Sequence, residues 1–259
     1  MTQLVYGNVD AVLPAGGRIH GEYARVAGCT VKAMIPFGGE TILSRTIKAL
    51  KALPQPGRVV VIGPEETLEE ARACGADASL LEGNSGPENI FKGIDWLQSG
   101  EDPARKALIV TTDMPFVNAS SLYELLNLCP PDADICVPLV RREPFEVVYP
   151  DLVRTDSRLA DGYFRLGGAF LVDVDAMRAG RAHFESVFAA RKSNLKMARL
   201  IGLQTALKYA AGKLSTTDIV NKASSILHCR GAAVHDVDPV LGFDIDLLEE
   251  YQYAIKQAF

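Results

Sequence analysis

The sequence predicts an α/β fold, a three-layer α/β/α sandwich with a mostly parallel central sheet. Two patterns and the chain length lead to this prediction. Apolar runs alternate with segments of helical spacing from residue 10 to about residue 140, which indicates right-handed βαβ units. The runs 58–62 and 107–111 are rich in consecutive apolar and β-branched residues, as expected of strands buried on both faces. The 259 residues fit one domain over 1–259 that carries an insertion.

The elements follow from local pattern. A strand over 10–15 ends in two glycines, and a helix over 41–53 is stopped by Pro54 and Pro56. Further strands are expected over 58–62, 78–81, 107–111, 135–139, 147–149, 169–172 and 232–234, and further helices over 65–74, 87–97, 120–128, 183–225 and 247–258. Ligands of such sheets bind beyond the carboxyl ends of the strands. The loops after Leu13 and Val110 are therefore the expected places for chemistry.

Composition excludes several classes of protein. The net charge of −5 gives no electrostatic reason to expect a nucleic-acid partner. No apolar run reaches the roughly 20 residues that span a bilayer, and the first ten residues do not resemble a signal peptide, so we expect a cytoplasmic protein. The five cysteines are odd in number and show no C-x-x-C spacing, which argues against a disulfide framework or a zinc site. The sequence does not determine whether the protein is a monomer or a homo-oligomer.

A glycine-containing loop follows the first predicted strand, with Gly16 and Gly17 next to Arg18. Consecutive glycines let backbone N–H groups approach phosphate oxygens, and Arg18 or Arg25 could pair with the same phosphates. The loop is neither G-x-G-x-x-G nor a P-loop. The alternative is an ordinary turn between a strand and a helix.

Lys32 and Asp113 are the strongest single candidates for catalysis. A lysine shortly after a phosphate loop can neutralise charge on a triphosphate as pyrophosphate leaves, although most lysines are simply solvated. Asp113, in the turn Asp113-Met114-Pro115, ends a buried strand where a nucleotide is expected. Its carboxylate can hold Mg²⁺, which prefers oxygen ligands and keeps waters and phosphates in its shell. The alternative for Asp113 is a helix N-cap.

A late acidic segment offers a second metal ligand. Either Asp244 or Asp246 is expected to face the site, while the other caps the helix after it; Asp236 and Asp238 compete for the same role. The segment 82–89, with Ser85 and Asn89, could line a base pocket, but a surface turn explains it equally well.

Together these motifs resemble the MobA-like nucleotidyltransferase family, which includes molybdenum cofactor guanylyltransferases and shares its fold with sugar-phosphate nucleotidyltransferases. The opening pattern L-x-A-G-G…R…K is matched by Leu13, Ala15, Gly16, Gly17, Arg25 and Lys32. The D-x-P turn at Asp113 and the acidic segment 242–250 match as well, over residues 9–174 and 231–257. The resemblance implies a nucleotide-diphospho-sugar transferase-like, Rossmann-related fold.

The resemblance also implies a reaction. Mg²⁺ held by Asp113 and Asp244 or Asp246 would bind an NTP, Lys32 and a loop arginine would stabilise the leaving pyrophosphate, and a phosphorylated small molecule would attack in line. Leu13, Ala15, Gly16, Gly17, Ser85, Asn89 and Asp113 are then the expected nucleotide-binding residues. For the acceptor we expect Gly167, Gly168 and arginines among Arg141, Arg142, Arg154, Arg158 and Arg165, unless these arginines are merely solvated.

Two rival functions remain. A nucleotide-sugar-dependent glycosyltransferase of related fold would use a D-x-D metal pair, and Asp244-Ile245-Asp246 has that spacing. Such a pair normally follows a mid-chain strand, where this chain has a lone Asp113. The other rival is a nucleotide-binding protein without turnover.

The helical insertion over 183–225 has no counterpart in the short members of the family. It contains a basic amphipathic stretch over 192–213. Such helices can lie on anionic membranes, but more often they pack their apolar side on their own domain, and we expect the latter.

Overall fold

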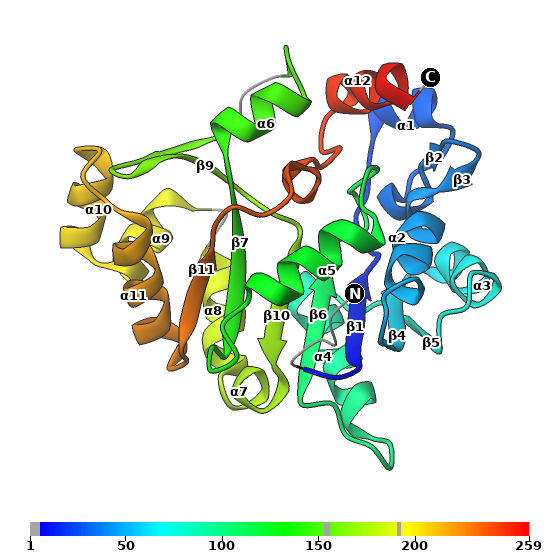
Figure 1. Cartoon of the computed structure of the whole chain (residues 1–259), viewed down its shortest axis with the longest axis horizontal. Helices are drawn as coiled ribbons and strands as arrows, with labels where there is room; N and C mark the ends of the chain where they lie inside the picture. Colours follow the sequence, from blue (N-terminus) through cyan, green and yellow to red (C-terminus); the bar gives the residue numbers. More distant parts are fainter. Residues whose placement is uncertain (1–5, 153–155, 191–192, 259) are drawn as a thin grey trace.

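A mixed β-sheet runs through the middle of the molecule (Figure 1). The computed structural model describes residues 6–152, 156–190 and 193–258. Four parallel strands form one half of the sheet in the order β5-β4-β1-β6. These are β1 (Val9–Pro14), β4 (Pro56–Gly63), β5 (Ala78–Leu81) and β6 (Lys106–Val110).

The other half of the sheet contains the antiparallel pairs. β10 (Ala169–Asp173) lies between β6 and β7 (Ile135–Arg141), antiparallel to both. β7 also pairs with β11 (Gly231–Val234), in parallel, and with the hairpin of β8 (Ser157–Leu159) and β9 (Gly162–Leu166). A small hairpin, β2 (Pro36–Phe37) and β3 (Glu40–Thr41), stands apart from the sheet.

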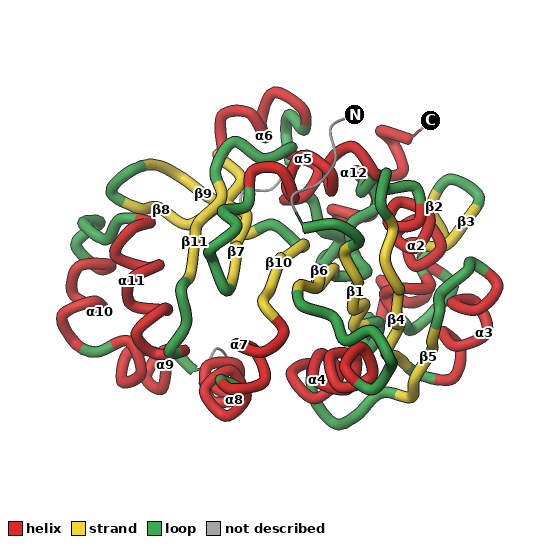
Figure 2. Tube along the Cα trace, turned by 60° about the horizontal axis from the view of Figure 1, so that its bottom comes forward, coloured by secondary structure: helices red, strands yellow, loops and turns green. Residues whose placement is uncertain are grey.

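Helices cover both faces of the sheet (Figure 2). One face carries α2 (Ile42–Lys51), α3 (Glu65–Ala73) and α5 (Ala119–Leu128); the other carries α4 (Gly86–Gln98), α7 (Val174–Ala179) and α8 (Arg181–Ala190). At the β11 end lie α9 (Asn194–Ile201), α10 (Leu203–Ala210) and α11 (Thr216–Leu227). Three helices, α1 (Gly21–Ala27), α6 (Arg142–Val148) and α12 (Leu248–Ala258), lie at the edge where β1 ends. Within the described ranges, no helix is both long and apolar enough to cross a membrane.

The alternation of side chains along β1 divides the core between the two faces. Ala11 and Leu13 pack with α2 and α5, whereas Val12 packs with α4. α4 approaches β1 closely at Gly93, where a Cβ would lie 2.5 Å from Val12 Cγ1. Any larger residue at Gly93 would therefore push α4 away from the sheet.

The three-layer prediction is confirmed, and the predicted helical stretch over 183–225 is occupied by α8 to α11. The strand expected over 147–149 is wrong, because these residues end α6 and the turn after it. Val147 and Val148 are β-branched, which favours strands, but α6 buries Phe145 and leaves Val147 83% exposed. Tertiary packing of one face thus overrides the local preference.

Candidate active site

The glycine loop after β1 is held by backbone pairing with the segment before Lys32. Ile19 N donates to Thr30 O at 3.0 Å, and Lys32 N donates to Gly17 O at 2.9 Å. Lys32 opens a short 3-10 helix, η1 (Lys32–Met34). A Cβ on Gly17 would lie 3.5 Å from Lys32 Cβ. The loop pairing therefore places the lysine directly beside the glycines.

The Lys32 ammonium lies between two carboxylates. Its Nζ is 3.3 Å from Asp113 Oδ2 and also contacts Asp246 Oδ1, and its side chain is 14% exposed. Burial alone would lower the pKa of Lys32, but the two carboxylates outweigh it and raise the pKa above the usual lysine value. Lys32 is therefore a fixed positive charge at the carboxyl edge of the sheet.

Backbone bonds bring the late acidic segment to the end of β6. Ile245 N donates to Asp113 O at 3.0 Å, and Tyr23 Oη donates to Ile245 O at 2.9 Å. Ile245 is fully buried, so the residues on either side of it, Asp244 and Asp246, both lie at the site. The expected division of roles, with one aspartate capping the next helix, is not observed: Leu247 N donates instead to Glu250 Oε2 at 2.8 Å.

The carboxylates can accept a hard cation. Asp113 Oδ1 is buried and has no hydrogen-bond partner, and such an orphaned oxygen is costly unless something binds it. Asp113, Asp244 and Asp246 supply only oxygen donors, the set that Mg²⁺ prefers. The described part of the chain contains no preassembled set of three or more acidic, histidine or cysteine side chains that could hold a metal. The residues therefore fit an ion that completes its shell with phosphates and water.

Asp244 carries the largest perturbation in this cluster. Burial, together with the charges of Asp113, Asp246 and Glu250, raises its pKa to about 7, and Arg165 opposes the shift. In the metal-free protein the folded state thus holds a proton on Asp244 that the unfolded chain loses near pH 4. Stability attributable to this group is present below about pH 4 and is lost as the pH rises through about 7.

Replacing Asp244 by Asn should remove this penalty. At pH 8 and without metal, we expect Asp244→Asn to unfold with a free energy about 2–4 kcal/mol higher than wild type, and the two proteins to be equal at pH 4. Urea denaturation across this range, in the presence of a chelator, measures the difference. Equal stabilities at pH 8 would show that Asp244 is not destabilised by its neighbours.

A cleft of about 580 Å³ opens between the glycine loop and the start of α4. Its lining includes Gly16, Gly17, Ser85 and Asn89, four of the residues expected to bind nucleotide. Asn89 is buried; its Oδ1 accepts from Gly83 N at 2.6 Å. A Cβ on Gly16 would come within 3.1 Å of Asn89 Nδ2, so the amide group points toward the loop. The cleft therefore has a polar wall and extends to Gly17, which lies beside Lys32.

Arg18 and Arg25 differ in their positions relative to the cleft. Arg18 lines the cleft, forms an ion pair with Glu82 and donates from Nη1 to Gly16 O at 2.6 Å. Arg25 lies on α1, is mostly exposed and pairs with Glu22 at 3.2 Å. The structure thus brings Arg18 to the cleft and leaves Arg25 outside it.

Other expected nucleotide-binding residues have structural roles as well. Leu13 and Ala15 are fully buried, and Ala15 N donates to Ile62 O at 2.7 Å. Their side chains belong to the core, so contact with a ligand would fall to Gly16 and Gly17. Ser85 is the N-cap of α4 and accepts from Glu88 N at 3.3 Å.

One cleft residue escaped sequence reasoning. Phe188 of α8 lines the cleft next to the start of α4, and a Cβ on Gly86 would be 2.7 Å from Phe188 Cζ. It lies more than one hundred positions from Gly86, and nothing in its local pattern distinguishes it from a core aromatic. The helical region after β10 thus contributes directly to the candidate nucleotide cleft.

The residues expected to bind the acceptor do not form one cluster, unlike the residues around Lys32. Arg141 lies over the Phe164 ring and is 3.7 Å from Asp236, and Arg158 is exposed on β8. Protein atoms fill the space beside the glycines: a Cβ on Gly168 would clash with Thr111 Oγ1, and one on Gly167 would lie 2.9 Å from Pro138 Cγ.

The other arginines fall into two groups. Arg142 and Arg165 both pair with Asp156, at 2.7 and 3.4 Å, and Arg165 is buried next to the acidic segment. Arg154 lies outside the described residues.

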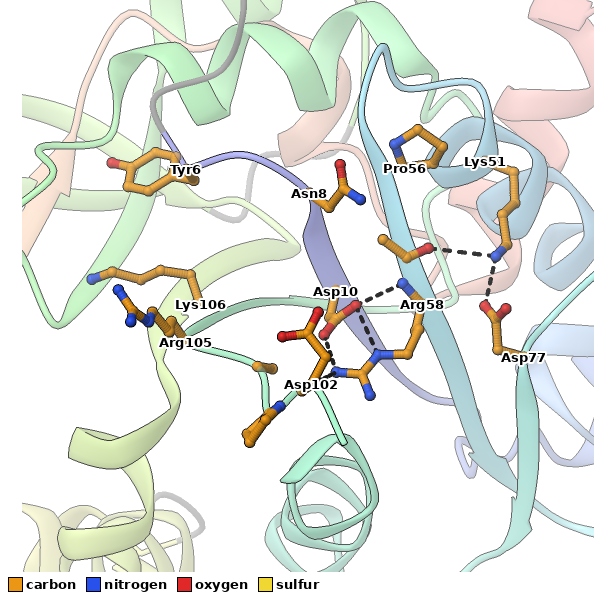
Figure 3. Close-up of a pocket in the computed structure, with 13 residues that line it drawn as sticks. Tyr6, Asn8, Asp10, Lys51, Pro56, Arg58, Asp77, Asp102, Arg105 and Lys106 are labelled. Atoms are coloured by element: carbon orange, nitrogen blue, oxygen red, sulfur yellow. Dashed lines mark hydrogen bonds and ion pairs between the residues drawn. The ribbon is translucent and has the colours of Figure 1, made fainter. Parts of the chain in front are cut away.

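A second polar hollow, of about 520 Å³, lies at the opposite edge of the sheet, where β1, β4 and β6 begin. Figure 3 shows the Arg58 guanidinium against the Asp10 carboxylate and Lys51 directed at Asp77. The Nη2 atom of Arg58 is 2.6 Å from Asp10 Oδ2, and Lys51 Nζ is 2.6 Å from Asp77 Oδ2. These charges satisfy one another, so this hollow is better explained by structural ion pairs than by chemistry.

The Asp10–Arg58 pair makes a testable contribution to stability. Asp10 Oδ1 also accepts from Arg58 N at 2.6 Å, so Asp10→Ala leaves a backbone and a guanidinium donor without their acceptor. We expect the free energy of unfolding to fall by about 2–3 kcal/mol. Urea denaturation measures this; a loss below about 0.5 kcal/mol would be typical of an ordinary surface pair and would contradict the structural role.

The chain is similar to known proteins in sequence and in fold. A family model described as the MobA-like NTP transferase domain matches residues 11–166. A solved hypothetical transferase from Thermus thermophilus is similar over 94% of this chain and 99% of its own, with 26% identity and a TM-score of 0.82.

Two further structures share the fold at lower identity. 4-Diphosphocytidyl-2C-methyl-D-erythritol synthase from Anaerococcus prevotii has a TM-score of 0.59 at 11% identity, over 97% of this chain and 98% of its own. A nucleotidyl transferase from Methanothermobacter thermautotrophicus has a TM-score of 0.58 at 15% identity, over 97% of each chain.

Proposed function

The chain belongs to the MobA-like NTP transferase family, and from this premise we propose that it transfers a nucleoside monophosphate from an NTP to a phosphorylated small molecule, with Mg²⁺ and release of pyrophosphate. The family makes it a nucleotidyltransferase. The choice of acceptor class and the need for Mg²⁺ are the parts that the proposal adds.

One observation carries the proposal. Asp113 lies 81 positions after Lys32 in the sequence and Asp246 lies 214 positions after it, yet the three side chains meet beside the glycine loop. A fixed ammonium next to Gly17 suits the charge of a triphosphate, and the orphaned Asp113 Oδ1 suits a cation that accompanies it. A strand-end site with both signs of charge is what phosphate transfer requires.

The residues of this chain would act by positioning and by neutralising charge. Backbone groups of Gly16 and Gly17 would seat the triphosphate, while Asn89 and Ser85 would face the base across the cleft. An oxygen of the acceptor phosphate would attack the α-phosphorus, and the bond from that phosphorus to the oxygen bridging the β-phosphate would break. Lys32 and Arg18 would balance the negative charge that builds up on the departing pyrophosphate.

Mg²⁺ fits the acidic cluster. Asp113 with Asp244 or Asp246 would hold the ion, which would draw charge from the phosphates when bound. Because Lys32 already contacts Asp113 and Asp246, ion and lysine would share these carboxylates. Loading the site would also lower the pKa of Asp244, since a nearby cation favours the ionised carboxyl.

One of the similar proteins suggests where to look for an acceptor. The Anaerococcus prevotii structure is named for synthesis of a diphosphocytidyl sugar alcohol. A polyol phosphate or a sugar phosphate is therefore the first acceptor class to test. Arg141 and Arg158 are the arginines that we expect to bind its phosphate group.

A pyrophosphate-release assay tests the proposal. The protein is incubated with each of four NTPs, Mg²⁺ and pools of sugar and polyol phosphates, with Asp95→Asn, an exposed change on α4, as the folded control. Release that depends on both an acceptor pool and Mg²⁺ supports the proposal. Release of a nucleoside diphosphate from a preformed nucleotide-sugar, with no use of NTP, supports the rival glycosyltransferase and contradicts it.

A further inference from the structure

The two short helices α9 and α10 direct their apolar side chains in opposite directions. Met197, Leu200 and Ile201 of α9 line an apolar cavity of about 220 Å³ that α11 also lines. These three residues are half-buried, whereas α10 has no buried residue and its leucines are exposed. Leu203 is 75% exposed and Leu207 is 60% exposed. The expectation that this stretch packs its apolar side on its own domain therefore holds for α9 but not for α10.

The orientation of α10 shows that these leucines point outward. Thr205 of α10 lines the same internal cavity. At 3.6 residues per turn, position 205 lies roughly half a turn away from both Leu203 and Leu207, which are themselves neighbours one turn apart. The leucines thus form an apolar stripe on the side of the helix that faces away from the protein. Tyr209, which is also 52% exposed, lies one turn after Thr205 and is therefore not part of this stripe.

The surroundings of this stripe are basic. No acidic residue occurs between Glu185 and Asp218, whereas six lysines and arginines do, in a chain with a net charge of −5. Lys196, Arg199 and Lys213 are exposed. Lys208 is partly neutralised by Asp218 at 3.0 Å. Positive charge is therefore concentrated in the segment of the chain that carries the exposed leucines, while the rest of the chain has a net negative charge.

An apolar stripe flanked by lysine and arginine is the pattern of helices that lie at a membrane interface. We propose that the α9–α10 face, formed by Leu203, Leu207 and Lys208 of α10 and by Lys213 just after it, binds the surface of an anionic lipid membrane. Leu203 and Leu207 enter the boundary between headgroups and acyl chains, and the basic side chains contact the anionic headgroups. The acidic remainder of the molecule is repelled, which orients the protein on the membrane.

This face is connected to the candidate active site. Figures 1 and 2 place α9 and α10 at the end of the molecule beyond β11, with α9 next to α8. Phe188 of α8 lines the nucleotide cleft, and Leu214, just after α10, accepts from Ala160 N at 2.9 Å beside Arg158 on β8. Docking through the α9–α10 face would therefore hold the cleft close to the membrane. The proposal does not depend on which nucleotide or acceptor the cleft takes.

Co-sedimentation of the full chain with lipid vesicles tests the proposal. We expect the protein to bind vesicles of equal parts phosphatidylcholine and phosphatidylglycerol, and not vesicles of phosphatidylcholine alone. The double variant Leu203→Ser/Leu207→Ser should bind the anionic vesicles at least about tenfold more weakly. Lys208→Gln/Lys213→Gln should weaken binding by about fivefold for each charge removed and reduce its dependence on salt.

The matched control is Leu128→Ser, which removes a leucine that is 42% exposed on α5, far from this face. It should bind anionic vesicles like wild type. Failure of the wild type to bind anionic vesicles would overturn the proposal, as would binding that the leucine variant leaves unchanged. A wild-type dimer that the leucine variant dissociates, without vesicle binding, would assign the face to a second copy of the chain and would also overturn it.

Discussion

Lys32→Met is expected to lower kcat by about 10²–10³-fold with the acceptor found by the pyrophosphate-release assay. Methionine keeps much of the length of the side chain and removes its charge. The loss follows because Lys32 lies beside Gly17 and is the ammonium that Asp113 and Asp246 hold in place. Steady-state kinetics measure the effect on kcat and KM separately.

The same variant should change metal binding in the opposite direction. Without the competing ammonium, Asp113 and Asp246 face each other unneutralised, so Lys32→Met should bind Mg²⁺ more tightly than wild type in the absence of nucleotide. Lys48→Met, which removes an exposed lysine on α2, is the control and should match wild type in both assays. If Lys32→Met kept the wild-type kcat, Lys32 would have no role in the chemical step.

Asp113→Asn is expected to lower kcat/KM by about 10³-fold, which corresponds to roughly 4 kcal/mol of transition-state stabilisation. The substitution keeps the shape of the side chain and removes the negative charge of a carboxylate whose Oδ1 atom is buried without a hydrogen-bond partner. Mg²⁺-dependent NTP binding should be lost, whereas any weaker, Mg²⁺-independent binding should remain, because the glycine loop is unchanged. Calorimetry and turnover measure the two effects.

Asp95→Asn is the matched control for this change. Asp95 is about half exposed on α4 and pairs with Arg178 and Arg181, away from the acidic cluster. If Asp113→Asn retained Mg²⁺-dependent binding at wild-type affinity, another group would have to hold the ion, and the assignment of Asp113 would be wrong.

The first half of the fold could be predicted because its signals are local. The strand runs 58–62 and 107–111 correspond to β4 and β6, and helix starts and stops were marked by residues such as Thr41 and Pro54. The second half depends on antiparallel partners that lie far away in sequence, such as β10 between β6 and β7. Local preference then misleads, as Val147-Val148 does at the end of α6.

The candidate site shows the same division. Lys32 and Asp113 could be predicted individually, because one follows a glycine loop and the other ends a buried strand, whereas Asp246 was only one of two alternatives with Asp244. Their meeting could not, since it depends on the pairing of Lys32 N with Gly17 O and of Ile245 N with Asp113 O. The positions of Arg18 and Arg25 likewise depend on neighbours: Arg18 lines the cleft and pairs with Glu82, whereas Arg25 pairs with Glu22 on α1. Phe188 had no local signal at all.

Titration calorimetry of the wild-type protein with ATP, CTP, GTP and UTP, each with and without Mg²⁺, tests whether the cluster of Lys32, Asp113 and Asp246 is a site for NTP and Mg²⁺. We expect that one NTP binds, that Mg²⁺ strengthens its binding, and that the heat signal reports a single site per chain. If no NTP bound in the presence of Mg²⁺, the cluster of Lys32, Asp113 and Asp246 could not be a site for NTP and Mg²⁺, and the proposed reaction would be contradicted.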